Sequence, residues 1–224
     1  MDSLASQLEM FLDALLERVD PKTAALLQRT HAELLAHDYP HHAVGEGQIA
    51  PDFTLPDQHG RPVSLHEALA RGPVVLTFFR GGWCPFCSIA LRALNRVLPK
   101  LRRQGASLLA ISPQTPDQSL STAERNALCF PVLSDAGNAV ARRYGLVWKL
   151  DADYRALYER LGHDLPRING TPGWELPVAA GYVIDTDGRV ALARVDPRVH
   201  RRLEPEEALE AVLRLHARHA EPTE

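Results

Sequence analysis

Apolar residues recur every three or four positions at the start of the chain. This spacing predicts an amphipathic helix over residues 4–19. Its apolar members are Leu4, Leu8, Phe11, Leu12, Leu15, Leu16 and Val19. Asp20 followed by Pro21 is typical of a helix cap and a first helical residue, so we expect a second helix from there to about His37. The two helices would form a hairpin whose apolar face must pack on the main domain or on a second subunit.

The pattern becomes strand-like from Pro51 onward. Phe53 and Leu55 alternate with polar neighbours before a turn at residues 57–60. Residues 74–79, VVLTFF, form a continuous run of β-favouring apolar residues, and such a run indicates a buried central strand.

A helix and a second strand are expected after this central strand. Arg80, Gly81 and Gly82 break the strand, and a helical pattern then continues to an end at Gly105. Residues 107–111 read SLLAI, which is again typical of a strand. We therefore expect one strand–helix–strand unit with parallel strands and a right-handed crossover.

Shorter elements are predicted in the middle of the chain. Ser121 and Glu124 have the spacing of a capping box that opens a helix. Residues 130–133 are a candidate short strand, and residues 137–144 read as a helix stopped by Gly145.

The last third of the chain contains an irregular stretch, a hairpin and a helix. Residues 148–176 are rich in Pro, Gly and Asn near their end and predict an inserted lobe or a long loop. Residues 182–185 and 190–195 flank the turn at 186–188, which predicts a β-hairpin, and a final helix is expected from Glu204. The whole pattern predicts an α/β protein with a mixed sheet.

This pattern divides the chain into two segments. Residues 1–45 are expected to be a helical extension with a linker, and residues 46–224 the main domain, with its insertion at about 148–176. The linker contains His37, Asp38, His41 and His42, which could hold a metal ion. A solvated linker is the favoured interpretation, because the spacing matches no known ligand pattern.

Composition and charge exclude several classes of protein. The 224 residues are 45% apolar and 24% charged, which favours one globular domain with extensions. The net charge is −3 and the basic residues are scattered, so we expect no nucleic acid partner. No apolar run approaches the length of a membrane span. The acidic N-terminus is unlike a secretory signal, and three cysteines do not make a disulfide scaffold, so we expect a cytoplasmic protein.

The segment RGGWCPFC, residues 80–87, carries the candidate chemistry. Its two cysteines, Cys84 and Cys87, lie where a buried strand is expected to end and a helix to begin. The free amides at a helix start stabilise a thiolate and lower its pKa. Arg80 could add positive charge, and Gly81 with Gly82 would leave room for a substrate.

Three interpretations of this cysteine pair compete. A zinc site would need two further ligands, and no second spaced pair of Cys or His exists. A structural pair of buried thiols is the second possibility. A redox centre is favoured, because Cys-x-x-Cys within a strand–helix–strand unit is a fairly specific signal. No metal and no cofactor are expected, and Cys129 is expected to be a small buried apolar residue.

Four motifs together resemble a known family. They are FFRGGWCPFC (78–87), APDFTLPD (50–57), PVLSDAGNAVARRYGL (131–146) and YVIDTDGRV (182–190). In this order the chain resembles the alkyl hydroperoxide reductase / thiol-specific antioxidant family over residues 48–215, and in particular its peroxiredoxin-like branch with a CPxC site. The resemblance implies a thioredoxin-like three-layer fold with a mixed central sheet, to which the N-terminal hairpin is added.

The resemblance also assigns positions within the cysteine segment. Peroxiredoxins have a PxxxTxxC loop, in which Arg80 takes the place of the proline, Cys84 that of the threonine and Cys87 that of the peroxidatic cysteine. Thioredoxins instead have WCxxC, whose first cysteine attacks, and here that cysteine would be Cys84.

The late strand departs from both families. Ala179 stands where peroxiredoxins have an arginine, and Ala180 where thioredoxins have a cis-proline. Arg80, Arg201 or Arg202 could supply the missing charge, although the sequence does not place the last two in the pocket.

The resemblance implies a thiol peroxidase that reduces hydrogen peroxide or organic hydroperoxides. Cys87 would attack the peroxide, Cys84 would form a redox-active disulfide with it, and a thioredoxin-like or glutathione-like thiol would reduce that disulfide. The supporting residues would be Arg80, Gly82, Trp83 and Pro85. A thiol–disulfide oxidoreductase led by Cys84 and a redox sensor without enzymatic activity are the alternatives. A homodimer is possible through the helical hairpin.

Other residues near the predicted site have simpler explanations. Trp83 is expected to pack over the cysteine pair, and Trp148 to be part of the packing elsewhere. Gln114 could line the site, but a plain turn is favoured. Glu175 could tune a thiol, but a solvated loop is favoured.

Overall fold

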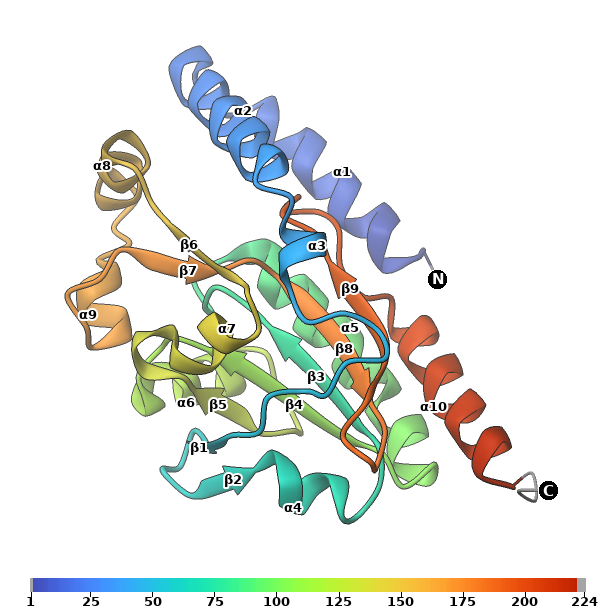
Figure 1. The fold of residues 1–224 in the computed structure, drawn as a ribbon. Coiled ribbons are helices and arrows are strands. Elements are labelled where there is room, and N and C mark those ends of the chain that lie inside the picture. The colour runs from blue at the N-terminus through green and yellow to red at the C-terminus, as the bar shows by residue number, and fades with distance from the viewer. Residues whose placement is uncertain (1, 221–224) are drawn as a thin grey trace.

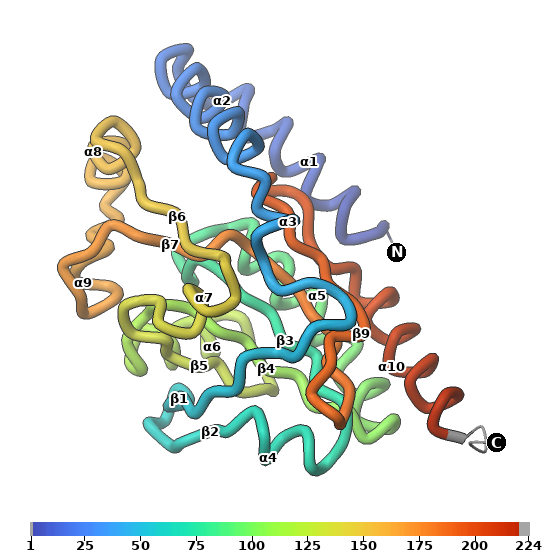
Figure 2. Tube along the Cα trace, viewed as in Figure 1, coloured from blue at the N-terminus to red at the C-terminus, as the bar shows by residue number. Residues whose placement is uncertain are grey.

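The computed structural model describes residues 2–220, and its architecture is shown as a ribbon in Figure 1 and as a tube in Figure 2. The helices are α1 (Leu4–Leu16), α2 (Pro21–Ala36), α3 (Tyr39–His42), α4 (Leu65–Leu69), α5 (Pro85–Arg103), α6 (Pro116–Arg125), the 3₁₀ turn η1 (Ala136–Asn138), α7 (Ala139–Arg143), α8 (Ala152–Arg160), α9 (Leu165–Asn169) and α10 (Pro205–Ala220). The strands are β1 (Thr54–Pro56), β2 (Pro62–Ser64), β3 (Val74–Phe78), β4 (Ser107–Ser112), β5 (Val132–Ser134), β6 (Val147–Lys149), β7 (Glu175–Pro177), β8 (Ala180–Ile184) and β9 (Val190–Val195).

A five-stranded mixed sheet in the order β5-β4-β3-β8-β9 forms the centre of the molecule. The strands β3, β4 and β5 are parallel, while β8 pairs with β3 and β9 in the antiparallel sense. All five residues of β3 are buried, as expected for a central strand covered on both faces. The predicted strand–helix–strand unit is therefore present as β3, α5 and β4, and the predicted hairpin as β8 and β9.

Side chains that alternate along β3 separate two cores on the two faces of the sheet. Val75 belongs to the core beneath α1, α5 and α10, and Leu76 to the core beneath α4 and α7. Alternate residues of a strand point to opposite faces, so one apolar run supplies both cores. The predicted α/β three-layer arrangement with a mixed sheet is confirmed.

The N-terminal hairpin packs on its own domain. Leu4 and Leu8 are buried, and the ring of Phe11 meets that of Phe86 edge-on with centroids 5.0 Å apart. The backbone N–H groups of Leu4 and Ala5 donate to the Glu204 carboxylate at 3.0 and 2.6 Å, so this side chain caps α1. Figures 1 and 2 show α1 lying across the end of the sheet, beside the chain that leads into α10. Of the two expected partners for the apolar face of the hairpin, the main domain is the one it contacts.

The segment predicted as a lobe or long loop is a small folded lobe. Strands β6 and β7 form a two-stranded antiparallel sheet, and α8 and α9 lie between them in the chain. The lobe has an aromatic core in which Trp148, Tyr154 and Tyr158 pack together. Arg29 of α2 forms ion pairs with Asp151 and Asp153 at 3.2 and 2.9 Å. The lobe thus contacts the hairpin through α8 and α2.

One predicted helix start is wrong. Helix α6 begins at Pro116 after Thr115, so Ser121 and Glu124 lie in its second half rather than at its N-terminus. Proline fixes a helical φ and lacks the N–H that a first turn leaves without a partner, which makes Pro116 the stronger start signal. The match to a capping box at 121–124 comes from residues whose backbone is already helical.

The predicted helix at 137–144 is shorter and has an irregular start. The segment begins as the 3₁₀ turn η1, in which Gly137 has a φ of 70°, and regular helix begins only at Ala139. The Asp135 carboxylate accepts the N–H groups of Val140 and Ala141 at 2.8 to 3.1 Å. This buried aspartate thus caps the helix that the turn introduces.

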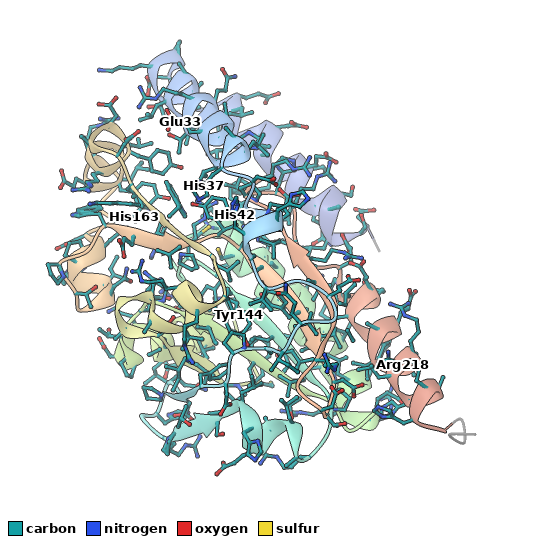
Figure 3. The ribbon with its side chains drawn as sticks, in the orientation of Figure 1. Glu33, His37, His42, Tyr144, His163 and Arg218 are labelled. Atoms are coloured by element: carbon teal, nitrogen blue, oxygen red, sulfur yellow. The ribbon has the colours of Figure 1, made fainter. Side chains whose placement is uncertain are left out.

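The histidine-rich linker forms the one-turn helix α3. The rings of His37 and His42, which Figure 3 labels, have centroids 5.8 Å apart and are tilted by 34° to each other. His41 pairs with Asp38 at 2.6 Å. Residues 2–220 hold no group of three or more His, Cys, Asp or Glu side chains arranged to hold a metal ion. Within the same residues, no helix combines the length and the apolar character needed to cross a membrane.

Candidate active site

The two cysteines of RGGWCPFC lie at the N-terminus of the long helix α5. Cys84 is the cap residue, with an extended backbone, and Pro85 is the first helical residue. Cys87 lies one turn further on, so the two thiols share the first turn of the helix. Both are free and buried, with 4% and 1% of their surfaces exposed. The expected position at a strand-to-helix junction is confirmed.

A buried glutamine holds the loop before the cysteines. Gln114 accepts the Gly82 N–H at 2.8 Å and the Thr122 hydroxyl at 3.2 Å, both through its Oε1 atom. A Cβ on Gly82 would lie 2.2 Å from the Thr122 Oγ1 atom, so only glycine fits here without a shift of α6. Gln114 thus lies in the turn that the sequence favoured and does not line the pocket, and its buried side chain holds the loop before the cysteines.

Arg80 brings one positive charge to the cysteines. Its side chain is 6% exposed and lies beside Tyr158 of α8 and the two thiols. Burial alone would lower the pKa of this guanidinium, but the surrounding Tyr and Cys side chains favour its charged form and the pKa is raised. The predicted supporting role of Arg80 thus has a geometric basis.

Arg202 brings a second charge from a distant part of the chain. It lies on the segment between β9 and α10, and its Nη1 donates to the Arg198 and Arg201 carbonyls at 3.1 and 2.6 Å. Its Nη2 atom is fully enclosed and has no hydrogen-bond partner. Burial lowers the pKa of Arg202, and the charge of Cys87 is the largest effect that opposes this. Of the two late arginines that the sequence could not place, Arg202 reaches Cys87, whereas Arg201 pairs with Glu9 at 3.1 Å.

The pKa values of the two thiols are shifted in opposite directions. A hydrogen bond from the Cys84 S–H is the largest cause that lowers the pKa of Cys87, to about 5, and it outweighs the effect of burial. The charges of Arg202 and Arg80 and the Arg80 backbone N–H act in the same direction. The pKa of Cys84 is raised because its proton is held in that hydrogen bond and because it is buried. Cys87 is the sulfur that carries the negative charge, and Cys84 keeps its proton.

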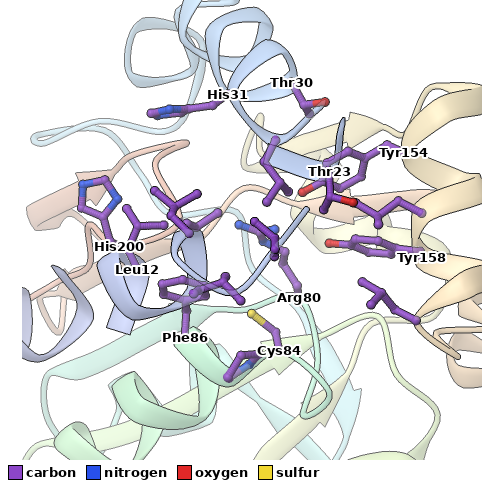
Figure 4. A pocket seen from close by; sticks show the side chains of 18 of the residues that line it. Leu12, Thr23, Thr30, His31, Arg80, Cys84, Phe86, Tyr154, Tyr158 and His200 are labelled. Carbon is purple, nitrogen blue, oxygen red and sulfur yellow. The ribbon is translucent and has the colours of Figure 1, made fainter. Parts of the chain in front are cut away.

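A pocket of about 350 Å³ opens beside the cysteines, between the hairpin and the lobe. Figure 4 shows Cys84 and Arg80 at its lower side, Tyr154 and Tyr158 on the lobe, and the hairpin above. Cys84 lines this pocket and Cys87 does not. Trp83 also lines it, with its ring 5.1 Å from that of Tyr158, so the tryptophan forms a wall beside the thiols as expected.

Two other predicted residues lie away from the cysteines. Glu175 begins strand β7 and forms an ion pair with Arg142 at 2.7 Å, so the favoured interpretation as a solvated loop is wrong. Cys129 is exposed, so its predicted burial is wrong. Leu128 and Phe130 on either side of it pack into the core, and the alternation along the backbone turns Cys129 outward.

The fold and the paired thiols define a thiol-redox protein with a thioredoxin-like sheet. Residues 46–193 match the model of the AhpC/TSA family, which is two thirds of the chain, and the protein belongs to this family. The match confirms the family resemblance of the sequence motifs.

Several proteins of known name are similar to the chain. Peroxiredoxin Q of Sedum lineare is 30% identical over 77% of this chain and 77% of its own length. Peroxiredoxin Q of Gentiana triflora is 32% identical over 66% of this chain, which spans 58% of that protein. The thiol-disulfide oxidoreductase ResA of Geobacillus thermodenitrificans is 35% identical over 46% of this chain and 59% of its own length. In structure, peroxidoxin BcpB of Mycobacterium tuberculosis is similar with a TM-score of 0.60 and 26% identity, over 78% of this chain and 97% of that one.

Proposed function

We propose that the protein is a thiol-dependent peroxidase that reduces hydrogen peroxide or organic hydroperoxides with Cys87 and Cys84. One observation carries the proposal: two free, buried thiols share the first turn of α5 beside Arg80, and this environment lowers the pKa of Cys87. Membership in the AhpC/TSA family and the similarity to proteins named peroxiredoxin support the same reaction.

The geometry supports a two-step oxidation of the pair. The Cys87 thiolate attacks the terminal peroxide oxygen, the O–O bond breaks, and Cys87 becomes a sulfenic acid while an alkoxide or hydroxide leaves. The leaving group takes the proton of Cys84, which becomes the second thiolate. Cys84 then attacks the Cys87 sulfur and releases hydroxide, so the pair ends as a disulfide and the peroxide as an alcohol or water.

An external thiol would complete the cycle. Because Cys84 lines the pocket and Cys87 does not, we expect the reductant to attack the Cys84 sulfur. The sulfur that leaves is then Cys87, whose low pKa makes it the better leaving group. A thioredoxin-like dithiol or a glutathione-like thiol fits this step.

The surrounding residues would act on charge and position. Arg80 and Arg202 would stabilise the Cys87 thiolate and the negative charge that develops on the leaving oxygen. Gly82 and Pro85 would shape the loop and start the helix, and Trp83 would close one side of the pocket.

The test is the rate of peroxide loss after reduced protein is mixed with one equivalent of hydrogen peroxide. We expect consumption well above that of a free thiol, together with the formation of a Cys84–Cys87 disulfide detected by mass spectrometry. Consumption at the free-thiol rate with hydrogen peroxide and with an organic hydroperoxide would refute the proposal.

A second candidate function is thiol–disulfide exchange, with Cys84 as the attacking sulfur. The position of Cys84 on the pocket wall favours it, as does the similarity to ResA over part of the chain. In that case a Cys87→Ser variant should trap a disulfide-bonded partner through Cys84. Trapping by Cys84→Ser and not by Cys87→Ser would assign first attack to Cys87 and favour the peroxidase.

Four further expectations stay predictions. A cytoplasmic location rests on the low number of cysteines, and a role in redox homeostasis would follow from the peroxidase reaction. The homodimer rested on a free apolar face of the hairpin, and that face packs on the hairpin's own domain. A sensor without turnover would show a disulfide that forms with peroxide but is not reduced by any external thiol.

A further inference from the structure

The pocket between the hairpin and the lobe leads to one sulfur of the pair. Cys84 lines it and Cys87 does not, and Figure 4 shows the Cys84 sulfur at its lower side with the hairpin above. Once the two cysteines are joined in a disulfide, an external thiolate must attack one sulfur while the other leaves. The sulfur that faces the pocket is Cys84, so the pocket is the path by which a reductant reaches the oxidised pair.

The dimensions of this path favour a small molecule. Both classes of reductant named above can carry out the exchange, and the pocket distinguishes between them. Its volume of about 350 Å³ falls in the range of small-molecule sites, which begins at roughly 300 Å³. Only 4% of the Cys84 surface is exposed, and ion pairs of Arg29 with Asp151 and Asp153 join the hairpin to the lobe. A cysteine on the surface of a folded protein would reach Cys84 only if these two walls separated.

The walls of the pocket favour an apolar reductant. Leu12 and Leu27 of the hairpin and Leu157 of the lobe are among the many apolar residues that line it. Within the described part of the chain, no acidic residue lines the pocket, and Arg80 is the lining residue with a permanent charge. A thiol with several charged groups would lose their hydration here and find one partner at most, which is costly. Apolar surface on the reductant, in contrast, gains free energy against these leucines.

The cysteine end of the pocket is suited to a sulfur anion. Arg80 lies beside Cys84 in Figure 4, is 6% exposed, and faces the charge of the reduced cysteines. In the disulfide neither sulfur is an anion, so the guanidinium can pair with an incoming thiolate and favour that form of the thiol. The Nε1 atom of Trp83, another lining residue, is enclosed and has no hydrogen-bond partner. This end of the pocket therefore has a positive charge and an unused N–H, and both favour an anion.

The exchange reaction favours a reductant with two thiols. Attack by the first thiolate forms a bond to Cys84, breaks the Cys84–Cys87 bond and releases Cys87 as a thiolate. Cys87 lies one helical turn away and can attack Cys84 again, which would expel the reductant. The volume is near the lower limit of small-molecule sites, so a second reductant molecule does not fit beside the first. A second thiol on the same molecule is already in place: it attacks the reductant's own bonded sulfur, closes a ring and releases Cys84, which takes a proton.

We propose that the pocket is the reductant site of the protein and that it takes a small apolar dithiol, in which two neighbouring thiols end an aliphatic chain. The thiols lie at Cys84 and Arg80, and the chain lies against Leu12 and Leu27. The reductant gives up two electrons and leaves as a cyclic disulfide, while the protein regains the Cys84 thiol and the Cys87 thiolate. The proposal rests on the proposed peroxidase function, whose cycle needs a reductant, and it names the class of that reductant.

The kinetic experiment starts from full-length protein that diamide has oxidised to the Cys84–Cys87 disulfide, so that no peroxide is needed. Dihydrolipoamide is the dithiol with an aliphatic chain, and dithiothreitol is the dithiol without one. Acid quenching, alkylation and mass spectrometry count the free thiols over time. We expect dihydrolipoamide to be the faster reductant and its rate to saturate with concentration.

A variant of the pocket wall tests the aliphatic contact. Leu27→Gln should slow dihydrolipoamide about tenfold more than dithiothreitol, as for the loss of one apolar contact. Leu27→Trp keeps the wall apolar but fills part of the space, and it should raise the concentration of dihydrolipoamide at half saturation. Leu35→Gln, on the same helix but exposed and outside the pocket, is the matched control and should change neither rate. Equal slowing of both dithiols by Leu27→Gln, or no slowing of either, would overturn the assignment of the pocket.

Other reductants test the remaining parts of the proposal. A mercapto-octanamide with a single thiol should stop at a mixed disulfide with Cys84, located by peptide mass spectrometry, and a mixed disulfide at Cys87 would overturn the assigned path. Faster reduction by thioredoxin than by dihydrolipoamide at equal concentration would overturn the choice of a small molecule.

The outcomes for the reductant site and for the peroxidase are separate. If the reduced protein consumes no peroxide but dihydrolipoamide reduces the diamide-made disulfide with the expected dependence on Leu27, the proposed function fails and the reductant site stands. If peroxide is consumed but dihydrolipoamide is no faster than dithiothreitol, the reductant site is refuted and the peroxidase stands.

Discussion

The segment that matches the family and the two segments that flank it contribute different parts of one site. The matched segment, residues 46–193, supplies both thiols, Arg80 and the helix start that holds them. The flanking segments supply Arg202, which faces Cys87, and the hairpin that covers the pocket. The two reacting sulfurs thus lie in one short motif. Part of the positive charge near them and the cover of the pocket come from the flanking segments.

The largest effect is expected inside the matched segment. Cys87→Ser should abolish peroxide reduction, a loss of about a thousandfold or more, because it removes the attacking sulfur. Cys84→Ser should retain the first reaction and stop at a Cys87 sulfenic acid, since no second sulfur is present to form the disulfide. Stopped-flow peroxide consumption and mass spectrometry of the intermediate measure the two outcomes, and equal loss in both variants would contradict separate roles.

The acid limb of the rate profile tests the charge on Cys87. Because its pKa is lowered to about 5, the thiolate persists at neutral pH and is lost as the pH falls through that value. The rate of the first oxidation should be flat around neutrality and fall about tenfold for each pH unit below the pKa. Ultraviolet thiolate absorbance of the reduced protein should follow the same curve and disappear in Cys87→Ser. A midpoint near that of free cysteine would contradict the electrostatic account of the site.

Arg202→Gln tests whether a flanking segment sets that charge. Loss of an adjacent opposite charge moves a pKa by one to three pH units, so the rate profile should shift upward and the rate at pH 6 should fall about tenfold. Arg201→Gln is the matched control, because Arg201 is the neighbour in sequence but pairs with Glu9 instead of Cys87. An unchanged midpoint in Arg202→Gln would mean that the matched segment alone lowers the pKa of Cys87.

Gln114→Ala should lower the free energy of unfolding and have only a small effect on the rate of peroxide reduction. The substitution leaves the partly buried Gly82 N–H without its acceptor, and such a loss costs about 1–3 kcal/mol when the group is fully buried. Urea denaturation measures the free energy of unfolding. Thr122→Val is the comparison, because it removes the hydroxyl that donates to this Oε1 atom and to the Gln118 carbonyl, at 3.2 and 2.8 Å, and keeps the bond from Gly82.

Cys129→Ser should have the smallest effect. The thiol is exposed and lies outside the pocket, so we expect a change in stability within about 0.5 kcal/mol and unaltered peroxide consumption. The same two assays check it. A loss of turnover would contradict this prediction, because it would show that Cys129 takes part in the reaction.

Local signals in the sequence predicted the parts of the site that depend on neighbours in the chain. The run VVLTFF, the break at Arg80–Gly82 and the helical pattern after Pro85 were enough to place both cysteines at a helix start. The same kind of signal misled at Ser121 and at Cys129, where a short motif was interpreted without knowing which backbone conformation or which face the fold would use.

Contacts between distant residues could not be predicted in this way. Gln114 lies 32 residues from the Gly82 amide that it accepts, and Arg202 is separated from Cys87 by most of the second half of the chain. A turn residue and a surface-type arginine have the same appearance in sequence whether or not they face a thiol, because their role depends on which loops the sheet brings to one edge.

The sequence by itself determined the order of the elements, the family, and the position of a dithiol at the start of a helix, since these depend on local periodicity and on a contiguous motif. Only the tertiary structure decided which sulfur carries the charge and what covers it. The reason is physical: a pKa depends on burial and on nearby charges, and the charges come from Arg80 and Arg202, which meet only after the chain has folded. The hairpin that covers the pocket also reaches it only in the folded chain.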